Sequence, residues 1–272
     1  MELTKAQEQA IKHIKGNLQI IACAGSGKTE VVSRRIAEII KSGVKPENIL
    51  AFTFTEKAAE ELKFRIRKKI DESCPKTPEL SEMYVGTIHS FCFKILKEIM
   101  PKFRNYDVLD EHTRVLLLAG YGNHKHLHLD KLNVPWRYAS ISAFIRNVDV
   151  IREESIDPND LPEGEFKIGY KRYEELLEKE RFLDFSSMIR HVVDLLEKDK
   201  SLLKDVQKKY QYITVDEYQD VNPLQEKLIR LLAGANGNLC VVGDDDQAIY
   251  QWRGTQVEAI LKWAILKKLK SE

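Results

Sequence analysis

The sequence contains no apolar run long enough to cross a membrane. Its longest apolar runs, such as Val115–Ala119, fall far short of the roughly 20 residues that a membrane-spanning helix needs. The first residues, MELTKAQEQA, are polar and lack the apolar core of a secretory signal. We therefore expect no membrane partner.

Cysteine is scarce, and no two cysteines form a C-x-x-C pair. This scatter argues against a disulfide framework or a structural zinc site. Reduced thiols in a cytoplasmic protein fit the pattern better. The cysteines are Cys23, Cys74, Cys92 and Cys240.

An excess of either charge is also absent. Lys and Arg number 43 against 42 Asp and Glu, which gives a net charge of +1. Global charge therefore neither supports nor excludes a nucleic-acid partner, and only a local basic face could do so. The 272 residues, 43% hydrophobic and 31% charged, suit one large globular domain or a core with a smaller insert.

Short β-branched and apolar runs recur along the chain, each followed by turn residues and then by a helical pattern. Because the runs are apolar on both faces, they predict strands buried in a parallel sheet of an α/β fold. Helical periodicity is clearest at residues 29–41 and 56–70. The predicted strands are Leu18–Ala22, Ile49–Phe54, Met83–Val85, Tyr212–Val215 and Leu239–Val242.

The regular alternation stops in the middle of the chain. Residues 104–181 show helical patterning and turns but no convincing strand, and Ser155–Phe166 is rich in Pro, Asp and Gly. We predict an all-α insert at 104–181 within an α/β core formed by residues 1–103 and 182–272.

The stretch NLQIIACAGSGKTE, residues 17–30, resembles a phosphate-binding loop between a strand and a helix, with Ala22 at the position that is usually glycine. Backbone N–H groups of such a loop wrap phosphates, and the next helix points its N-terminus at them. Gly25 and Gly27 permit close backbone approach. Lys28 would reach the β- and γ-phosphates, and Thr29 would bind Mg²⁺. The alternative is a plain small-residue turn, which the flanking strand and helix disfavour.

Two later strands end in polar residues suited to the same site. After the strand in YITVDEYQD, Asp216 could hold Mg²⁺ and Glu217 could polarise the attacking water. A solvated acidic turn is the alternative, and the phosphate loop upstream makes it less attractive.

The stretch VVGDDDQAIYQWRG follows the same pattern. Gln247 could sense the γ-phosphate just beyond a strand end. Tyr250 and Trp252, beside Arg253, suggest a surface on which bases stack. Packing of Trp252 in the core is the alternative reading.

Together these stretches resemble the N-terminal half of a superfamily 1 DNA helicase of the UvrD/Rep/PcrA type. LTKAQEQAI is similar to the Q-motif, and ACAGSGKT to the family's own phosphate loop, which also begins with alanine. ILAFTFTEKAAEELKFRI and VGTIHSFCFKIL are similar to motifs Ia and Ib. VDEYQDVNPLQ and VVGDDDQAIYQWRG match motifs II and III. Six motifs in family order form a specific signature.

The resemblance implies a RecA-like domain that binds Mg-ATP against a second RecA-like domain, with single-stranded DNA lying across both. It assigns catalytic roles to Glu217, Lys28, Gln247 and Arg253. The implied nucleotide contacts are Gln7, Ala24, Gly25, Ser26, Gly27, Lys28, Thr29 and Arg35, with Thr29 and Asp216 holding the metal. The implied DNA contacts are Phe54, Thr87, His89, Tyr250 and Trp252. The full enzyme would translocate in the 3′-to-5′ direction.

Three departures from the family pattern stand out. Glu30 replaces an arginine that commonly stacks on adenine, a role that Arg34 or Arg35 could take over. Ile88 replaces a phenylalanine in motif Ib. Motifs IV to VI do not occur in these 272 residues, so we expect the second RecA-like domain to be supplied in cis or in trans.

Other readings stay open. A nucleotide-dependent binding or regulatory module would not translocate, but the hydrolytic base Glu217 argues against that class. The basic run KFRIRKK, residues 63–69, could meet the DNA backbone, although a solvated helix face is favoured. His124, His126 and His128 alternate along the chain, with Asp130 as their one acidic neighbour, so a metal site there is disfavoured.

Overall fold

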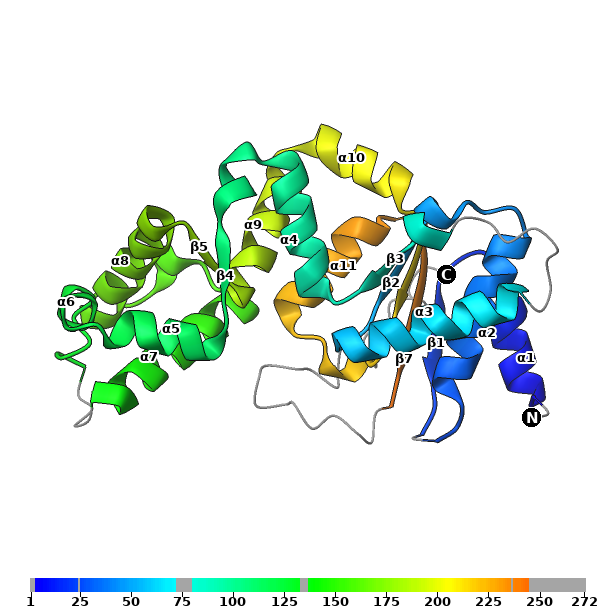
Figure 1. Ribbon diagram of the computed structural model, residues 1–272, viewed down its shortest axis with the longest axis horizontal. Helices are drawn as coiled ribbons and strands as arrows, with labels where there is room; N and C mark the ends of the chain where they lie inside the picture. Colours follow the sequence, from blue (N-terminus) through cyan, green and yellow to red (C-terminus); the bar gives the residue numbers. More distant parts are fainter. Residues whose placement is uncertain (1–2, 24, 72–79, 133–136, 236, 245–272) are drawn as a thin grey trace. The chain divides into compact units, whose positions relative to one another are not determined.

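The computed structural model describes residues 3–23, 25–71, 80–132, 137–235 and 237–244 (Figure 1). The chain divides into two compact units. The core unit comprises residues 1–91 and 195–272, and the insert unit comprises residues 92–194. The predicted helical insert at 104–181 lies within the insert unit.

The core unit contains a parallel sheet, as predicted. Among the described residues five strands pair in the order β1-β7-β6-β2-β3, and each lies at one of the predicted apolar runs. Ile21 is in register with Gly243, and Phe52 with both Val215 and Gly86, so the carboxyl ends of the strands meet at one edge. The strands are β1 (Leu18–Ile21), β2 (Ile49–Phe52), β3 (Tyr84–Gly86), β6 (Tyr212–Val215) and β7 (Asn238–Gly243).

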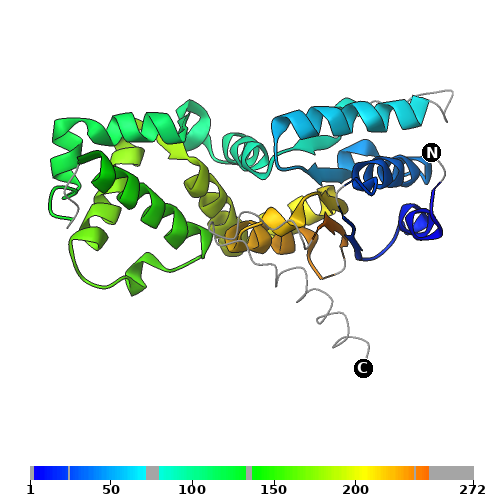
Figure 2. The ribbon, with the colours of Figure 1, turned by 90° about the horizontal axis from the view of Figure 1, so that it is seen from below.

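Helices cover both faces of this sheet. On one face α2 and α3 lie side by side and contribute Ile36, Ile39, Leu62 and Ile66 to the core, as Figure 1 and Figure 2 show. On the other face Phe52 is buried, and its ring centroid lies 5.3 Å from that of Phe91. The α-helices with residues in this unit are α1 (Lys5–Lys12), α2 (Lys28–Lys41), α3 (Glu56–Asp71), α4 (Ile88–Ile99), α9 (Phe185–Lys198), α10 (Lys200–Lys209) and α11 (Pro223–Ala233), with η1 (Pro46–Asn48), η2 (Leu80–Glu82) and η5 (Tyr218–Asp220) as 3₁₀ turns.

The insert unit is mainly helical. Its elements are η3 (Pro101–Asn105), β4 (Asp107–Leu109), α5 (Glu111–Ala119), α6 (Tyr121–His126), α7 (Arg137–Glu153), η4 (Pro158–Asp160), α8 (Glu165–Glu180) and β5 (Phe182–Asp184). The expectation of an all-α insert was wrong at β4, which pairs in parallel with β5. A strand of 3 residues is too short to show alternation, and its partner lies far away in sequence.

A buried charge network ties the insert unit together. Asp184 is fully buried, and both of its carboxylate oxygens accept hydrogen bonds from Arg152 Nη1 at 2.6 and 2.7 Å. Tyr173 donates to Asp184 Oδ2 at 2.7 Å, and Arg114 lies 3.4 Å from the same oxygen. Burial alone would raise the pKa of Asp184, but the two guanidinium groups outweigh it and hold the pKa far below its usual range.

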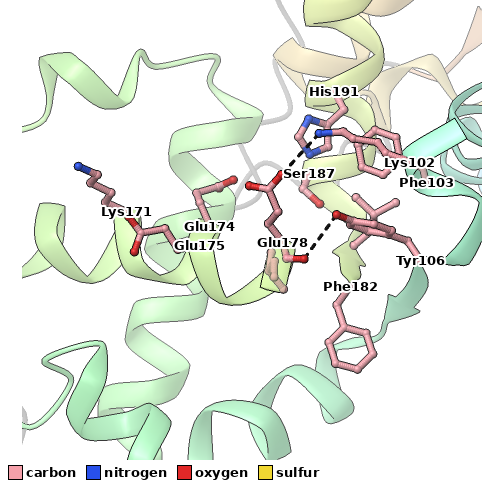
Figure 3. Close-up of a pocket in the computed structure, with 12 residues that line it drawn as sticks. Lys102, Phe103, Tyr106, Lys171, Glu174, Glu175, Glu178, Phe182, Ser187 and His191 are labelled. Carbon is pink, nitrogen blue, oxygen red and sulfur yellow. Dashed lines mark hydrogen bonds and ion pairs between the residues drawn. The ribbon is translucent and has the colours of Figure 1, made fainter. Parts of the chain in front are cut away.

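A cavity of about 210 Å³ also opens in the insert unit (Figure 3). Figure 3 shows Lys102 and Tyr106 both directed at Glu178. Lys102 Nζ lies 3.8 Å from Glu178 Oε1, and the Tyr106 hydroxyl donates to the backbone carbonyl of Glu178 at 3.5 Å. The ring of His191 packs 5.1 Å from that of Phe103, and burial lowers the pKa of this histidine. The cavity lining includes none of the predicted ATP-contacting or DNA-contacting residues.

The histidines of the YGNHKHLHL stretch have contacts within the protein. His124 lies 3.0 Å from Ser140 Oγ, and His128 pairs with Glu165. Within the part of the chain that the structure describes, no three His, Cys, Asp or Glu side chains gather as a metal site. No helix in that part has the length and apolar character needed to span a membrane.

The buried network generates a stability prediction. Replacing Arg152 by Met keeps much of the buried volume but leaves Asp184 without its main cation, so the free energy of unfolding should fall by about 3–5 kcal/mol. Arg190→Met is the matched control, because Arg190 pairs with Asp194 at the surface and should cost at most about 1 kcal/mol. Urea unfolding followed by circular dichroism measures both, and equal losses would contradict the assigned role of Arg152.

Candidate nucleotide site

The predicted phosphate loop lies at the carboxyl edge of the core sheet. It leaves β1 at Ala22, whose backbone N–H donates to the carbonyl of Gly243 at the end of β7, at 3.1 Å. On the neighbouring strand, Asp216 follows β6, and its N–H donates to the carbonyl of Phe52 at 2.9 Å. In parallel α/β sheets ligands bind at this edge.

Backbone conformation explains the glycines of the loop. Gly25 and Gly27 have φ values of 74° and 84°, in the left-handed region that favours glycine. Gly27 directly precedes α2, so the unpaired N–H groups of the first helical turn face the loop. The hydroxyl of Ser26 is buried and makes no hydrogen bond within the described residues. A buried donor of this kind fits a ligand oxygen. Ala24 lies outside the described residues.

Lys28 is held close to the loop. Its ammonium donates to the carbonyl of Ala22 at 3.0 Å and lies 3.6 Å from the carboxylate of Asp244. Both side chains are almost fully buried, so their attraction is poorly screened by solvent. Thr29, in the same helical turn, is partly exposed.

The two acidic residues after β6 occupy an energetically unfavourable place. Burial raises the pKa of Asp216 to about 6, and the nearby charge of Glu217 adds to the rise. Glu217 has a φ of 51°, a left-handed conformation that is uncommon outside glycine. Strain of this kind often marks a functional position.

Gln219 connects this acidic pair to the lysine. Its amide nitrogen donates to Glu217 Oε2 at 2.7 Å, and its amide oxygen accepts from the N–H of Asp244 at 3.0 Å. The contacts therefore run from Lys28 through Asp244 and Gln219 to Glu217. The sequence motifs did not predict roles for Gln219 or Asp244. Asp244 directly follows β7, and Gln219 lies in the turn after β6, three residues beyond Asp216, so their places beside the predicted residues were the available signal.

Gln7 also reaches the loop. Its amide nitrogen donates to the carbonyl of Ser26 at 2.9 Å, while its amide oxygen accepts from the N–H of Thr4 in a capping box of α1. The amide is therefore fixed beside the phosphate loop.

The two arginines near the loop make contacts with other residues of the protein. Arg35 is 1% exposed, and its guanidinium lies 3.5 Å from the carbonyl of Ile14, which argues against the predicted nucleotide contact. Position 35 falls on the face of α2 that packs against the sheet. Arg34 instead pairs with Glu30 at 2.6 Å, and Lys69 of α3 pairs with Glu30 at 3.0 Å. Burial alone would raise the pKa of Glu30, but hydrogen bonds from Arg34 and Lys69 lower it.

Three predicted DNA-contacting residues stand at the same sheet edge. Phe54 follows β2 and is 44% exposed. Thr87 and His89 follow β3, and Thr87 donates to Glu56 at the start of α3 at 2.9 Å. The other predicted residues, Gln247, Tyr250, Trp252 and Arg253, lie outside the described residues.

Nearly the whole chain is similar in sequence to known proteins. Residues 3–265 match the model of the family described as the UvrD/REP helicase N-terminal domain. The chain belongs to this family. It is 34% identical to the ATP-dependent DNA helicase PcrA of Staphylococcus epidermidis, over 96% of this chain and 36% of that protein. It is also 34% identical to PcrA of Staphylococcus aureus, over 94% of this chain and 35% of that protein.

Membership of the UvrD/REP family confirms the resemblance seen in the six motifs, and the five-stranded parallel sheet confirms the α/β fold. The chain spans about a third of the length of these relatives. The names of these relatives describe an ATP-dependent DNA helicase. These names belong to proteins that extend well beyond the matched region.

The raised pKa of Asp216 predicts a stability change with pH. The folded chain holds this proton up to about pH 6, whereas the ordinary pKa is 3.8. The free energy of unfolding should therefore fall as the pH rises through that window, by about 3 kcal/mol for a shift of this size.

Asp216→Asn removes this titration. The variant should be more stable than the parent chain at pH 8 and equally stable at pH 4, in chelator and without nucleotide. Thermal unfolding at both pH values measures the difference. Asp205→Asn, at an exposed position in α10, is the control and should show no such dependence. A parent chain that is less stable than Asp216→Asn by the same amount at both pH values would contradict the prediction.

Proposed function

We propose that this chain is the ATP-binding and DNA-binding motor domain of an ATP-dependent DNA helicase. Hydrolysis of Mg-ATP would drive 3′-to-5′ stepping on single-stranded DNA, with a second RecA-like domain in cis or in trans. The observation that carries the proposal is the convergence of Lys28, Asp244, Gln219 and Glu217 through contacts of 3.6 Å or less. The loop proposed to bind phosphates and the carboxylate proposed to activate water therefore lie at the same edge of the sheet.

Nucleotide binding would use groups that the structure already aligns. Backbone N–H groups of the loop and of the first turn of α2 would surround the phosphates. Lys28 would exchange its contact with Asp244 for the β- and γ-phosphates, and Ser26 Oγ would gain a partner. Gln7 would face the base.

A magnesium ion would bind at the same sheet edge. Thr29 and Asp216 offer a hydroxyl and a carboxylate, the oxygen ligands that Mg²⁺ prefers. When bound, the ion would neutralise charge on the phosphates.

Glu217 is the group proposed to orient and deprotonate the attacking water. The hydrogen bond from Gln219 holds one of its carboxylate oxygens, leaving the other to face water. Because Gln219 also accepts from the N–H of Asp244, a movement at the end of β7 would move Glu217. Gln219 is thus a positioning residue in this proposal.

We predict modest affinity for Mg-ATP in the isolated chain, with a Kd of roughly tens of micromolar, or about −6 to −7 kcal/mol. One RecA-like domain forms only one wall of the ATP cleft, and Arg35 is buried. Lys28→Ala should abolish binding because it removes the loop's cation. Lys41→Ala, at the far end of α2 and paired with Glu38, is the matched control. Calorimetry measures both variants, and sub-micromolar binding by the parent chain would contradict the need for a second wall.

We also predict that the isolated chain hydrolyses ATP only at a trace rate and does not unwind duplex DNA. An arginine supplied across a domain interface typically contributes about 10³–10⁵ to the rate of phosphoryl transfer. Glu217→Gln should remove the residual rate while leaving ATP binding intact. Release of phosphate, measured with and without oligothymidylate, tests this. DNA-stimulated turnover of several per second, on the order of typical complete enzymes, would show that the site is completed in another way.

A further inference from the structure

An exposed aromatic residue stands on the outer face of α3, away from the nucleotide site. Phe64 is 70% exposed, the largest exposed fraction among the large apolar side chains that the structure describes. Phe64, Arg67, Lys68 and Asp71 line a shallow surface groove, which we call the Phe64 groove. Figure 1 shows α3 running along the outside of the core unit.

Packing does not account for Phe64. The core-facing side of α3 consists of Ala59, Leu62, Ile66 and Ile70, all buried. Phe64 lies outside this stripe, so its ring adds little to the core. An aromatic side chain in this position is instead available to a partner.

The structure divides the basic run of residues 63–69 into paired and unpaired cations. Lys63 pairs with Glu60 at 3.0 Å, Arg65 with Glu61 at 2.6 Å and Lys69 with Glu30 at 3.0 Å. Arg67 and Lys68 have no acidic partner among the described residues. They follow Phe64 by three and four positions, which places them on the same face of the helix.

We propose that the Phe64 groove is a second contact surface for single-stranded DNA, separate from the proposed contacts Phe54, Thr87 and His89 at the sheet edge, although Phe64 itself lies near the end of the stretch similar to motif Ia. A base would stack on Phe64, and Arg67 and Lys68 would contact the adjoining phosphates. An exposed ring beside unpaired cations is the combination that binds single strands without sequence preference. An acidic peptide would pair with the cations, but its carboxylates would offer no stacking partner for the ring of Phe64. The inference rests on the proposed DNA-binding function.

The position of α3 relates this groove to the first DNA surface, which is the set of proposed contacts Phe54, Thr87 and His89 at the sheet edge. The helix begins at Glu56, two residues after Phe54, which is one of the proposed contacts. At a rise of about 1.5 Å per residue, Phe64 lies about 12 Å along α3 from Glu56. This length corresponds to roughly three or four nucleotides at the stacked spacing of about 3.4 Å per nucleotide of one DNA strand. The groove should therefore matter for long oligonucleotides and not for short ones.

The test compares oligothymidylates of about 4 nucleotides, too short to occupy the sheet-edge contacts and the groove together, and of about 16 nucleotides, which are the two ends of the usual range of site sizes for single-strand binders. Fluorescence anisotropy with the full chain measures both affinities. Phe64→Ala should weaken binding of the longer strand by roughly 5- to 100-fold and leave the shorter one unchanged. Phe64→Trp should retain the affinity for the longer strand, because its ring also stacks.

Salt dependence tests the two cations separately. Replacing Arg67 and Lys68 together by Ala should reduce the slope of log K against log salt concentration by about 0.7 for each lost phosphate contact. Lys63→Ala is the matched control on the same helix and should leave the slope unchanged, because Lys63 is paired with Glu60.

The outcomes separate this inference from the proposed function. If the parent chain binds both strands and Phe64→Ala changes neither affinity, the groove is not a DNA surface, although the helicase proposal stands. If the groove variants instead lose affinity for a polyglutamate peptide alone, the groove serves a protein partner and the inference is overturned. If the parent chain binds neither strand, both proposals fail. Loss of both affinities in Phe54→Ala would support the first DNA surface independently.

Discussion

The parallel register of the core sheet is the constraint on which the site depends. Ile21 pairs with Gly243, Val215 pairs with Val241, and Phe52 pairs with Val215. These pairings bring the carboxyl ends of the strands to one edge of the sheet. The polar residues that follow the strands therefore lie at that edge. The phosphate loop near the N-terminus and the acidic residues after β6 are distant in sequence, and only the strand pairing brings them together. A shift of register by one residue would reverse the faces of a strand and move its terminal side chains away from the site.

Buried charges are treated differently in the two units. In the insert unit Asp184 is surrounded by Arg152, Arg114 and Tyr173, so its charge is satisfied and its pKa is lowered. At the sheet edge Asp216 is partly buried beside another carboxylate, so its pKa is raised, and Glu217 adopts a left-handed backbone conformation. The first arrangement stabilises a fold. The second leaves acidic groups poorly satisfied, which is the state in which a bound cation would bring the largest gain.

Much of the fold followed from the sequence, because buried parallel strands and amphipathic helices leave local patterns. The five strand runs and the helices at α2 and α3 are examples. The strand β4 was missed because its stability comes from pairing with β5, which no local pattern reveals. The bridge through Gln219 and the burial of Arg35 were missed for a related reason. Side-chain partners are set by the tertiary arrangement, and motif spacing predicts position at a site better than it predicts hydrogen bonds.

Glu30 illustrates how one residue redistributes charge over a surface. In the sequence it appears as a departure from the arginine of related helicases, and the structure places it between α2 and α3. There it pairs with Arg34 and Lys69, with Arg65 at 4.0 Å, so several cations are drawn toward the junction of the two helices. Glu30 thus holds two cations of the basic run, Arg65 and Lys69, in contacts within the protein. Helix geometry turns Arg67 and Lys68 away from that junction, and these two cations are left beside the exposed ring of Phe64. The basic run therefore has two faces, one whose cations join two helices and one whose cations meet solvent.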